Sequence, residues 1–371
     1  MEIVILQENL KKGISAVQNI IGKNLTLPIL NNILLSTENN LLKLTSTDLE
    51  IAISYWVPCK IQKKGQITIP TRLFSNFINN LPVKKIELKT KTNNVIQIKC
   101  ENFKSNIKGL DAKEFPIIPK IKTNLKTKIE YGKLIQGLNQ VINFTSLSNI
   151  RPEISGVFIN FNSKKIKVVA TDSFRLGEKV INLTNKETDQ VKNSIIIPLK
   201  TAQELIRVLS DKNKDELIEI FIEKNQVLFK TKELELISRL IEGNYPNYEQ
   251  LITDQFETTL ILDRIEFLNA IKISSLFSSK INDVKLKVFP KKSLVEILAQ
   301  DIEVGENIST LKGDIKGKEI EVIFNYKYLI DGLNSIETKK IIFGLNGEIN
   351  PGIIKPVGDQ SFIYVIMPIK L

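Results

Sequence analysis

The chain has 371 residues, of which 42% are hydrophobic and 25% are charged, a composition typical of soluble globular proteins with two or three domains. It contains no histidine and only two cysteines, Cys59 and Cys100, so it lacks the residues for a Ser-His-Asp or Cys-His mechanism, a disulfide framework or the usual zinc site. The formal net charge of +11 favours an anionic partner such as a nucleic acid, but a codon bias toward lysine explains the excess equally well.

No run approaches the roughly 18 consecutive apolar residues of a membrane span. The amino-terminal run MEIVILQENLKK carries Glu2 where a signal peptide would carry positive charge. There is also no phosphate loop of the GxxxxGK type and no dinucleotide fingerprint. The sequence therefore predicts a cytoplasmic protein with no membrane partner and no cofactor.

Six segments have apolar residues at the spacing of an amphipathic helix, with polar residues on the opposite face. Their apolar positions recur at intervals of about 128 residues, from Phe74 to Ala202 and on to Leu329. ITIPTR (67–72) and IIIPLK (195–200) both place a proline just before the second helix of a pair, where its missing N–H does no harm. In chain order, the predicted helical segments are Leu6–Val17, Phe74–Leu81, Leu134–Val141, Ala202–Leu209, Ile265–Ile271 and Leu329–Ile336.

Between these helices, polar and apolar residues alternate with period two, as in antiparallel strands. Strand-rich runs such as KKIELKTKTNNVIQIKC contain an Asn turn, and Asn346-Gly347 is the strongest signal for a tight hairpin. A strand-like segment opens on Thr-Asp at 46–55 and again at 170–179, with an echo, AQDIEVGE, at 299–306. We predict an α+β protein of three repeated domains, each with two helices packed on about eight short antiparallel strands. The predicted domains are residues 1–122, 126–252 and 254–371.

With these landmarks the chain resembles the bacterial DNA polymerase III beta subunit, the DNA sliding clamp. The resemblance runs from the first strand to the last residue, and its specificity comes from the order of the segments. The segments that carry it are LTLPILNNILL (25–35), STDLEIAI (46–53), RPEISGVFI (151–159), VATDSFRL (169–176), IIIPLK (195–200), SRLIEGNYPNYEQLI (238–252), FNYKYLIDGLNSI (324–336) and YVIMPIKL (364–371).

The resemblance implies the DNA clamp fold and a non-catalytic function. In that family two chains associate head to tail into a ring of six like domains, with helices lining the hole. The ring encircles double-stranded DNA without reading its sequence and tethers the DNA polymerase III alpha subunit and other proteins with a clamp-binding motif. It is loaded by a separate ATP-dependent clamp loader, so the resemblance predicts a homodimer that confers processivity.

A protein that slides along any sequence needs diffuse positive charge, because base-edge hydrogen bonds would trap it where they are satisfied. Basic residues recur at or near every predicted helix, and the loop SLSNIRPE (146–153) resembles the family loop that touches DNA. For any single lysine, a solvated helix face is the competing interpretation. The predicted DNA contacts are Lys11, Lys12, Lys23, Arg72, Lys133, Ser148, Arg151, Lys200, Arg207, Lys272 and Lys327.

The resemblance also implies an apolar cleft between the second and third domains that takes a short extended partner peptide. Without the resemblance, YVIMPIKL predicts a final core strand, but Met367-Pro368 should interrupt it, since proline cannot donate to a strand ladder. The predicted pocket residues are Ile154, Thr171, Ser173, Phe174, Arg175, Leu176, Pro246, Gln250, Leu251, Asn325, Tyr328, Ile349, Pro351, Val365, Ile366, Met367, Pro368, Ile369 and Lys370.

Ring closure in the family pairs an edge strand of the first domain with one of the third domain of the other chain. Opposite charges across these edges would select head-to-tail association. The residues predicted at this dimer interface are Lys104, Ser105 and Ile107 on the first domain and Leu276, Phe277, Asp301, Glu303 and Glu306 on the third.

Two other functions are possible for a chain of this composition. A carboxylate-dependent nuclease would use Asp48, Asp172 and Asp301 as magnesium ligands, but these aspartates lie in different predicted units, at strand starts where a turn-capping Asp is common. A repeat scaffold that binds only proteins would lack organised basic helices. We expect neither function, and no metal site.

Overall fold

The structure is a computed structural model that describes residues 1–22, 26–123, 126–148, 150–162, 164–184, 188–189, 193–210 and 215–370. The chain divides into two compact units. Unit 1 holds Met1–Gly132, strand β14 (Thr188–Asp189) and Gln203–Leu240. Unit 2 holds Lys133–Thr184, the segment that includes β15 (Ser194–Pro198) and the chain from Ile241 onward. No helix in the described ranges is long and apolar enough to cross a membrane.

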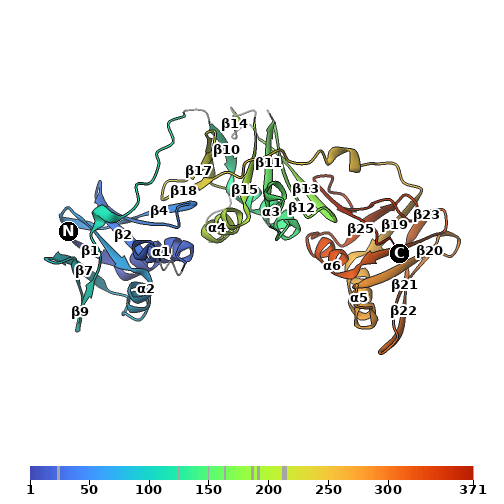
Figure 1. The fold of residues 1–371 in the computed structure, drawn as a ribbon, viewed down its shortest axis with the longest axis horizontal. Helices are drawn as coiled ribbons and strands as arrows, with labels where there is room; N and C mark the ends of the chain where they lie inside the picture. The colour runs from blue at the N-terminus through green and yellow to red at the C-terminus, as the bar shows by residue number, and fades with distance from the viewer. Residues whose placement is uncertain are drawn as a thin grey trace. The chain divides into compact units, whose positions relative to one another are not determined.

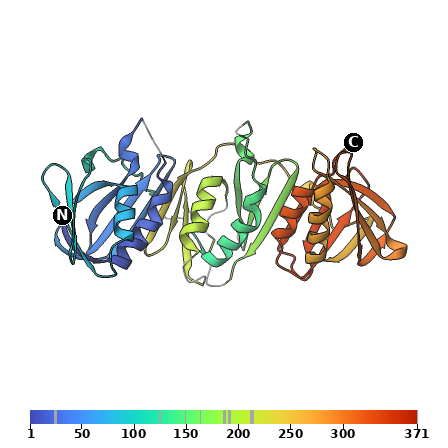
Figure 2. The same cartoon turned by 90° about the horizontal axis from the view of Figure 1, so that it is seen from below.

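Helices form in all six predicted segments, which confirms the helical periodicity. In unit 1, α1 and α2 pack against each other, and in unit 2, α5 and α6 do the same (Figure 2). Their apolar faces are buried, as at Leu10 and Ile14 of α1 and Phe267 and Ile271 of α5. The helices are α1 (Gln7–Val17), α2 (Thr71–Asn79), α3 (Tyr131–Val141), α4 (Leu199–Leu209), α5 (Arg264–Ser274) and α6 (Tyr326–Asn334).

Unit 1 contains two antiparallel sheets, and Figure 1 labels several of their strands. The first has the order β5 (Lys60–Lys63), β1 (Glu2–Leu6), β7 (Lys85–Lys91), β8 (Val95–Cys100), β9 (Phe103–Lys108). The second has the order β14, β10 (Lys126–Glu130), β16 (Leu217–Ile222), β17 (Gln226–Lys230), β18 (Leu234–Arg239), β4 (Ile51–Pro58), β3 (Leu41–Thr47), β2 (Asn32–Glu38), β6 (Gln66–Pro70).

Unit 2 likewise contains one nine-stranded sheet and one smaller antiparallel sheet. Its nine-stranded sheet has the order β15, β11 (Gly156–Asn162), β12 (Lys165–Thr171), β13 (Arg175–Asn182), β27 (Phe362–Ile366), β26 (Gly352–Pro356), β25 (Lys340–Leu345), β19 (Thr258–Asp263), β23 (Asp314–Gly317). Its four-stranded sheet has the order β22 (Gly305–Lys312), β21 (Leu294–Asp301), β20 (Asp283–Phe289), β24 (Ile320–Asn325).

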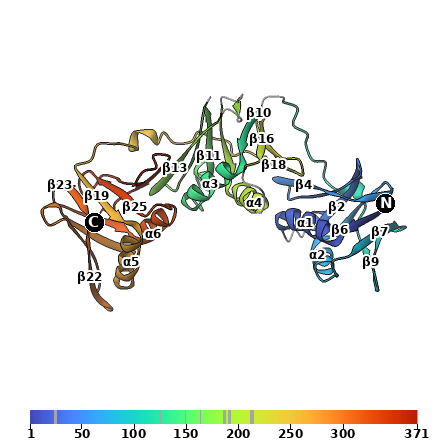
Figure 3. The same ribbon diagram turned by 180° about the vertical axis from the view of Figure 1, so that it is seen from behind.

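The two large sheets join strands that are far apart in the sequence. In unit 1, β18 pairs with β4, with Leu234 opposite Tyr55 (Figure 3). In unit 2, β13 pairs with β27, with Arg175 opposite Ile366. Each junction continues a sheet from one repeat into the next, so strand-ladder hydrogen bonds hold consecutive repeats together. The sequence pattern does not predict these junctions.

The hairpin predicted at Asn346-Gly347 exists, but the tight two-residue turn does not. Strands β25 and β26 do pair, yet β25 ends at Leu345 and β26 begins at Gly352. The Asn346 side chain accepts from the N–H of Glu257 at 2.8 Å and donates to the carbonyl of Gln255 at 2.9 Å. The Asn346 side chain thus holds this loop against the segment before β19. A longer loop therefore takes the place of the tight turn.

The first Thr-Asp element closes the turn between β3 and β4. The Thr47 hydroxyl donates to the carbonyl of Ile51 at 2.8 Å and accepts from the N–H of Leu49 at 3.0 Å. The Asp48 carboxylate accepts from the N–H groups of Glu50 and Ile51. Leu49 adopts a left-handed conformation with φ of 78°.

The second Thr-Asp element repeats this turn between β12 and β13. The Thr171 hydroxyl donates to the carbonyl of Arg175 at 2.7 Å and accepts from the N–H of Ser173, whose φ is 77°. The Asp172 carboxylate accepts from the N–H groups of Phe174 and Arg175. The repeated sequence therefore encodes the same hydrogen-bonded turn in both units, as predicted from the duplication.

Glu219 on β16 supports one prediction about pH. Its carboxylate lies 2.6 Å from the Lys126 ammonium and 3.2 Å from that of Lys128 on the adjacent β10. Burial alone would raise the pKa of Glu219, but the hydrogen bonds and charges of the two lysines outweigh it and lower the pKa below 4.5. A lowered pKa in the folded state means that the ionised carboxylate stabilises the fold above the unfolded-state pKa and that this contribution disappears at lower pH.

We therefore expect Glu219→Gln to reduce the free energy of unfolding by about 1 kcal/mol at pH 7 and to make little difference at pH 3. Urea titrations of both proteins at several pH values measure this difference in the free energy of unfolding. Glu114→Gln, at an exposed carboxylate, is the matched control. A gap of constant size from pH 7 to pH 3 would contradict the predicted role of the carboxylate.

Candidate functional site

The densest group of predicted residues surrounds Arg175 in unit 2. Its guanidinium donates to Asp172 at 2.9 Å, to Asp331 of α6 and to the carbonyl of Asn143 at 3.0 Å. It also lies 4.4 Å from the ring centroid of Tyr328. Burial on its own would lower the pKa of Arg175, but the hydrogen bonds to the two aspartates outweigh it and raise the pKa. Arg175 is thus a cationic centre that joins β13 to α6.

Phe174 lies beside this centre on the exposed side. Its ring is stacked near that of Tyr328, with centroids 6.3 Å apart and an interplanar angle of 25°. Phe174 is 59% exposed, which is unusual for so large an apolar side chain. Its carbonyl accepts from the N–H of Met367 at 2.8 Å, so the chain after β27 is held against this turn.

The carboxy-terminal segment leaves the sheet where the sequence predicts. Strand β27 ends at Ile366, just before Met367-Pro368, which confirms that Pro368 lies beyond the strand. The N–H of Ile369 then donates to the carbonyl of Ile323 at 2.8 Å. Tyr364 and Ile366 are fully buried, as expected for residues of a final core strand.

The segment before β19 takes part in a second network of polar contacts in unit 2. Tyr248 is buried and donates to the Glu178 carboxylate at 2.6 Å, and Lys167 lies 3.4 Å from the same carboxylate and 2.7 Å from that of Glu249. Burial, followed by the hydrogen bond to Glu178, raises the pKa of Tyr248, so its hydroxyl stays protonated and donates. Sequence reasoning missed this network, and the two tyrosines of NYPNYEQ were its only signal.

The predicted pocket residues fall into two groups by exposure. The first group is exposed or half-buried. Within it, contacts link Phe174, Arg175, Tyr328 and Met367, and we call these four residues the Phe174 surface. The second group is buried. The first group is Ser173, Phe174, Arg175, Pro246, Gln250, Leu251, Asn325, Tyr328, Ile349, Pro351, Met367, Ile369 and Lys370. The second group is Ile154, Thr171, Leu176, Val365, Ile366 and Pro368.

Arg207 and Lys12, both predicted DNA contacts, form ion pairs within the chain. Arg207 of α4 binds the Glu204 carboxylate at 2.7 Å and donates to the carbonyls of Ser15 and Ala16. Lys12 of α1 lies 3.6 Å from the Glu233 carboxylate. These ion pairs lower their availability for phosphate, and the sequence could not show them because the partners come from other elements.

The other predicted DNA contacts lie on separate helices and loops of both units. Arg151 donates to Glu153 at 3.0 Å and to the Ser173 hydroxyl at 3.1 Å, which ties the 146–153 loop to the turn before Phe174. Lys133 is half-buried. Lys23 lies outside the described residues. The exposed candidates are Lys11, Arg72, Ser148, Arg151, Lys200, Lys272 and Lys327.

The predicted dimer residues lie on two edge strands or next to them. Lys104, Ser105 and Ile107 are on β9, the last strand of its sheet, and Glu306 is on β22, the last strand of the four-stranded sheet (Figure 1). Ile107 is only 5% exposed because it packs into its own unit, so it has little side-chain area left for an interface. Leu276, by contrast, is 71% exposed.

Beside β22 lies an apolar surface with acidic neighbours. Leu276 and Phe277 follow α5, and Asp301, Glu303 and Glu306 flank the β21–β22 turn. This apolar surface also contains exposed side chains that were not predicted from the sequence. They are Ile273, Ile302, Val304 and Ile308.

Asp48, Asp172 and Asp301, the magnesium ligands of the nuclease alternative, each cap their own turn. Asp48 and Asp172 accept from backbone N–H groups as described above, and Asp301 accepts from the N–H groups of Glu303 and Val304. Among the residues that the structure describes, no three His, Cys, Asp or Glu side chains are grouped so that they could hold a metal ion. The turn-capping interpretation accounts for these carboxylates.

Comparisons with known proteins give one consistent match. Three family models match in succession: the N-terminal domain of the DNA polymerase III beta subunit over residues 1–119, its central domain over 128–247 and its C-terminal domain over 249–370. The beta sliding clamp of Bacillus subtilis is 30% identical over the whole of both chains, and that of Staphylococcus aureus strain Mu50 is 31% identical over 94% of each.

Solved structures agree with these matches. The crystal structure of the DNA polymerase sliding clamp from Bacillus subtilis has a TM-score of 0.94 at 28% identity, covering 100% of this chain and 99% of that one. The DNA polymerase III subunit beta from Pseudomonas aeruginosa also has a TM-score of 0.94, at 25% identity and full coverage of both chains. The similarity therefore extends over the entire fold.

Proposed function

The chain belongs to the DNA polymerase III beta subunit family, and from this premise we propose that it works as a head-to-tail homodimeric ring closed around duplex DNA. As a family member it is a non-catalytic processivity factor of DNA replication, a sliding clamp that acts with DNA and polymerase. The observation that carries the proposal is the unbroken similarity over all three successive domains, because a ring of repeated units needs every copy. We take the domains as residues 1–122, 126–252 and 254–371 and the working compartment as the cytoplasm.

In this proposal DNA is held by encirclement, with weak phosphate contacts that exchange as the ring moves. The exposed cations are the best candidates for those contacts, since their charges face solvent. Arg207, Lys12 and Arg151 contribute less, because carboxylates of their own unit bind them. The proposed primary contacts are therefore Lys11, Arg72, Lys200, Lys272 and Lys327.

Partner proteins are proposed to dock on the Phe174 surface. Exposed aromatic and aliphatic side chains there offer apolar area, and the carboxy-terminal segment beside Phe174 provides backbone groups for an extended peptide. The proposed partners are the DNA polymerase III alpha subunit, the clamp loader and other proteins with a clamp-binding motif. Loading uses ATP hydrolysed by the loader.

Primer extension tests the processivity function. With polymerase, clamp loader and ATP on a primed circular template, the chain should lengthen the products made in a single binding event. The chain alone with magnesium should leave the template intact. Unchanged product length would contradict the proposed function. Degradation of the template by the purified chain would favour the nuclease alternative.

The proposed ring interface predicts a charge-swap effect. Lys104 on β9 would meet the acidic β21–β22 turn of the other copy, so either Lys104→Glu or Glu303→Lys should weaken the dimer at least about tenfold by placing like charges together. Mixing the two variants should restore both interfaces of the ring, because one pairs the two swapped charges and the other pairs the two unchanged ones. Sedimentation at low concentration measures the dimer, and Lys91→Glu on β7 is the control, expected to change association little. Equal effects of all three single variants would contradict this pairing.

A further inference from the structure

One sheet of unit 1 has an outward face with a large excess of positive charge. This sheet, with the strand order β5, β1, β7, β8, β9, buries Ile3, Ile86 and Ile98 on the side where α1 and α2 lie (Figure 1). Its five strands lie wholly within the described residues and carry eight lysines and two glutamates, which leaves a net charge of +6. The lysines are exposed, so this charge faces solvent.

Most of these lysines have no carboxylate to pair with. Within the described residues, the only ion pair between strands of this sheet joins Lys89 to the Glu2 carboxylate at 3.1 Å. Lys85 and Lys91 form none. Lysines on edge strands commonly prevent pairing with another sheet, but β7 is an interior strand, so that role does not account for them.

The strand ladder also places like charges together. Lys99 on β8 lies opposite Glu87 on one side and opposite Lys104 on the other. Like charges directly opposite each other destabilise a sheet. Glu87 is also the one carboxylate within β7, where Lys85 and Lys89 lie two residues away on either side of it. The face therefore keeps a positive charge that the fold itself does not neutralise.

The equivalent sheets of the other two repeats are nearly neutral. Strands β10 and β19 precede α3 and α5 as β1 precedes α1, so the strands around them are the counterparts of this sheet. In the described residues, the second repeat has four positive and four negative side chains there, and the third has three and two. Lys126 pairs with Glu219 in the second repeat, and Asp263 lies opposite Lys340 in the third. A codon bias toward lysine acts on all three repeats and does not explain this difference.

Two exposed apolar side chains border the lysines. Leu6, at the end of β1, is 48% exposed and lies opposite Lys85 on the ladder. Val83 is 63% exposed and precedes Lys85 by two residues. A surface of this kind is complementary to carboxylates next to aliphatic groups. We call it the Lys85 surface, and it consists of Leu6, Val83, Lys85, Lys91 and Lys99.

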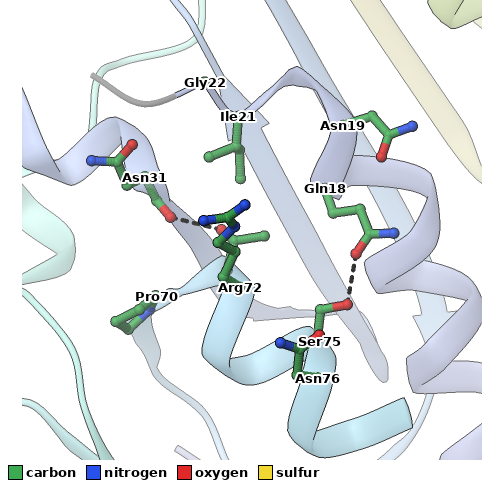
Figure 4. A pocket seen from close by; sticks show the side chains of 10 residues that line it. Gln18, Asn19, Ile21, Gly22, Asn31, Pro70, Arg72, Ser75 and Asn76 are labelled. Carbon is green, nitrogen blue, oxygen red and sulfur yellow. Dashed lines mark hydrogen bonds between the residues drawn. The ribbon is translucent and has the colours of Figure 1, made fainter. Parts of the chain in front are cut away.

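The Lys85 surface is separate from the other candidate sites. Figure 4 shows a cavity of about 580 Å³ where the end of α1 meets the beginning of α2. This cavity is lined by the proposed DNA contact Arg72 and by other residues, none of which belongs to the strands β5, β1, β7, β8 or β9. The Phe174 surface lies in unit 2. No DNA or partner contact proposed above uses the Lys85 surface.

We propose that the Lys85 surface docks an acidic segment of a partner protein, a run of carboxylates with aliphatic residues beside it. The carboxylates pair with lysines that the fold leaves uncompensated, and the aliphatic residues cover Leu6 and Val83. A nucleic acid fits less well. The outward positions from β5 to β8 carry no arginine and no aromatic side chain for base stacking, and a phosphate backbone gains nothing from Leu6. This second docking surface goes beyond the proposed function.

Methyl NMR of the full-length chain tests the proposal, because Leu6 and Val83 carry methyl groups within the surface. The probe is a synthetic peptide with a central run of aspartates and a Leu-Val pair at each end. Both methyl signals should shift in a saturable manner at low salt, and added salt should weaken the binding. Replacing both Lys85 and Lys99 with glutamate should weaken it at least about tenfold, because attraction becomes repulsion.

A charge-matched variant is the control for these two replacements. Lys291→Glu combined with Lys316→Glu makes the same change of charge at exposed positions of unit 2. Peptide binding to this variant should stay within about twofold of the unmodified chain, since salt screens charges at a distance.

Leu6→Ser separates a protein partner from a nucleic acid. Leu6 is the N-cap of α1, where serine is a favoured residue, so the variant should fold. It should weaken peptide binding about threefold, measured at Val83, since the apolar contact is lost. A short duplex and a short single strand of DNA serve as the nucleic-acid probes.

Three results would overturn the proposal. Neither Leu6 nor Val83 responds to the peptide, the variant with glutamate at Lys85 and Lys99 binds it like the unmodified chain, or either DNA probe shifts the two signals at lower concentration than the peptide. The last result would identify the partner as a nucleic acid. Retention on closed circular DNA, which tests the ring, should survive both lysine replacements, so failure of this proposal and failure of the ring can be told apart.

Discussion

Replacing Arg175 with alanine is expected to lower the free energy of unfolding of unit 2 by about 3 kcal/mol. Arg175 and Asp172 are both largely buried, and removal of the guanidinium leaves the Asp172 and Asp331 carboxylates and the Asn143 carbonyl without this donor. It also removes the contact with the Tyr328 ring. Denaturant titration monitored by tyrosine fluorescence or circular dichroism measures the loss.

Two variants make the Arg175 result specific. Arg175→Lys keeps the charge but not the planar donor fork, so it should lose an intermediate amount of stability. Arg239→Ala removes an arginine whose only described ion pair, with Glu50, is well exposed, and it should change stability by no more than about 0.5 kcal/mol. If Arg175→Ala is as stable as Arg239→Ala, the buried cationic centre does not hold β13 to α6.

Gly332→Ala should be the second most damaging change, at about 2–3 kcal/mol. Gly332 lies in α6, where alanine would ordinarily be preferred by about 1 kcal/mol. A Cβ atom at this position, however, would lie 2.2 Å from the ring of Tyr364, which is fully buried and donates to the carbonyl of Tyr328 at 2.8 Å. The ring has no room to withdraw, because it also packs on Phe144 with centroids 4.8 Å apart. Overpacking therefore outweighs helix propensity.

Thermal and urea unfolding of Gly332→Ala test this balance. Gly22→Ala is the matched control, because a Cβ there would meet no atom within 4 Å and should leave stability almost unchanged. Unfolding of Gly332→Ala at or above the urea midpoint of the unmodified chain would show that helix propensity dominates and that β27 can move away from α6.

The parts of the fold that depend on local sequence could be predicted. Helices follow from apolar spacing, as in Leu134 and Leu138 of α3, and the turns at Asp48 and Asp172 follow from side chains that bind their own backbone. The end of β27 follows from Pro368, which cannot donate to a ladder. In each case the cause lies within a few residues of the effect.

The parts that depend on distant partners could not be predicted. The β4–β18 and β13–β27 junctions join strands whose alternation fits any open sheet edge. The same limit applies to the candidate sites, since Glu233 binds Lys12 from far along the chain and Glu178 lies beneath Tyr248. The cavity beside Arg72 likewise forms only when the α1 end meets α2. A sequence pattern shows on which face of a helix or strand a residue lies, but not which residues the fold brings into contact with it.

The most direct measurement of encirclement uses nicked circular DNA. The chain is loaded by clamp loader and ATP, the complex is isolated in high salt, and half of it is linearised with a restriction enzyme. A closed ring should remain on the circles and leave the linear molecules through their ends, because it is retained by topology and the salt weakens its phosphate contacts. Equal loss from circles and linear molecules, or equal retention on both, would contradict a ring around DNA.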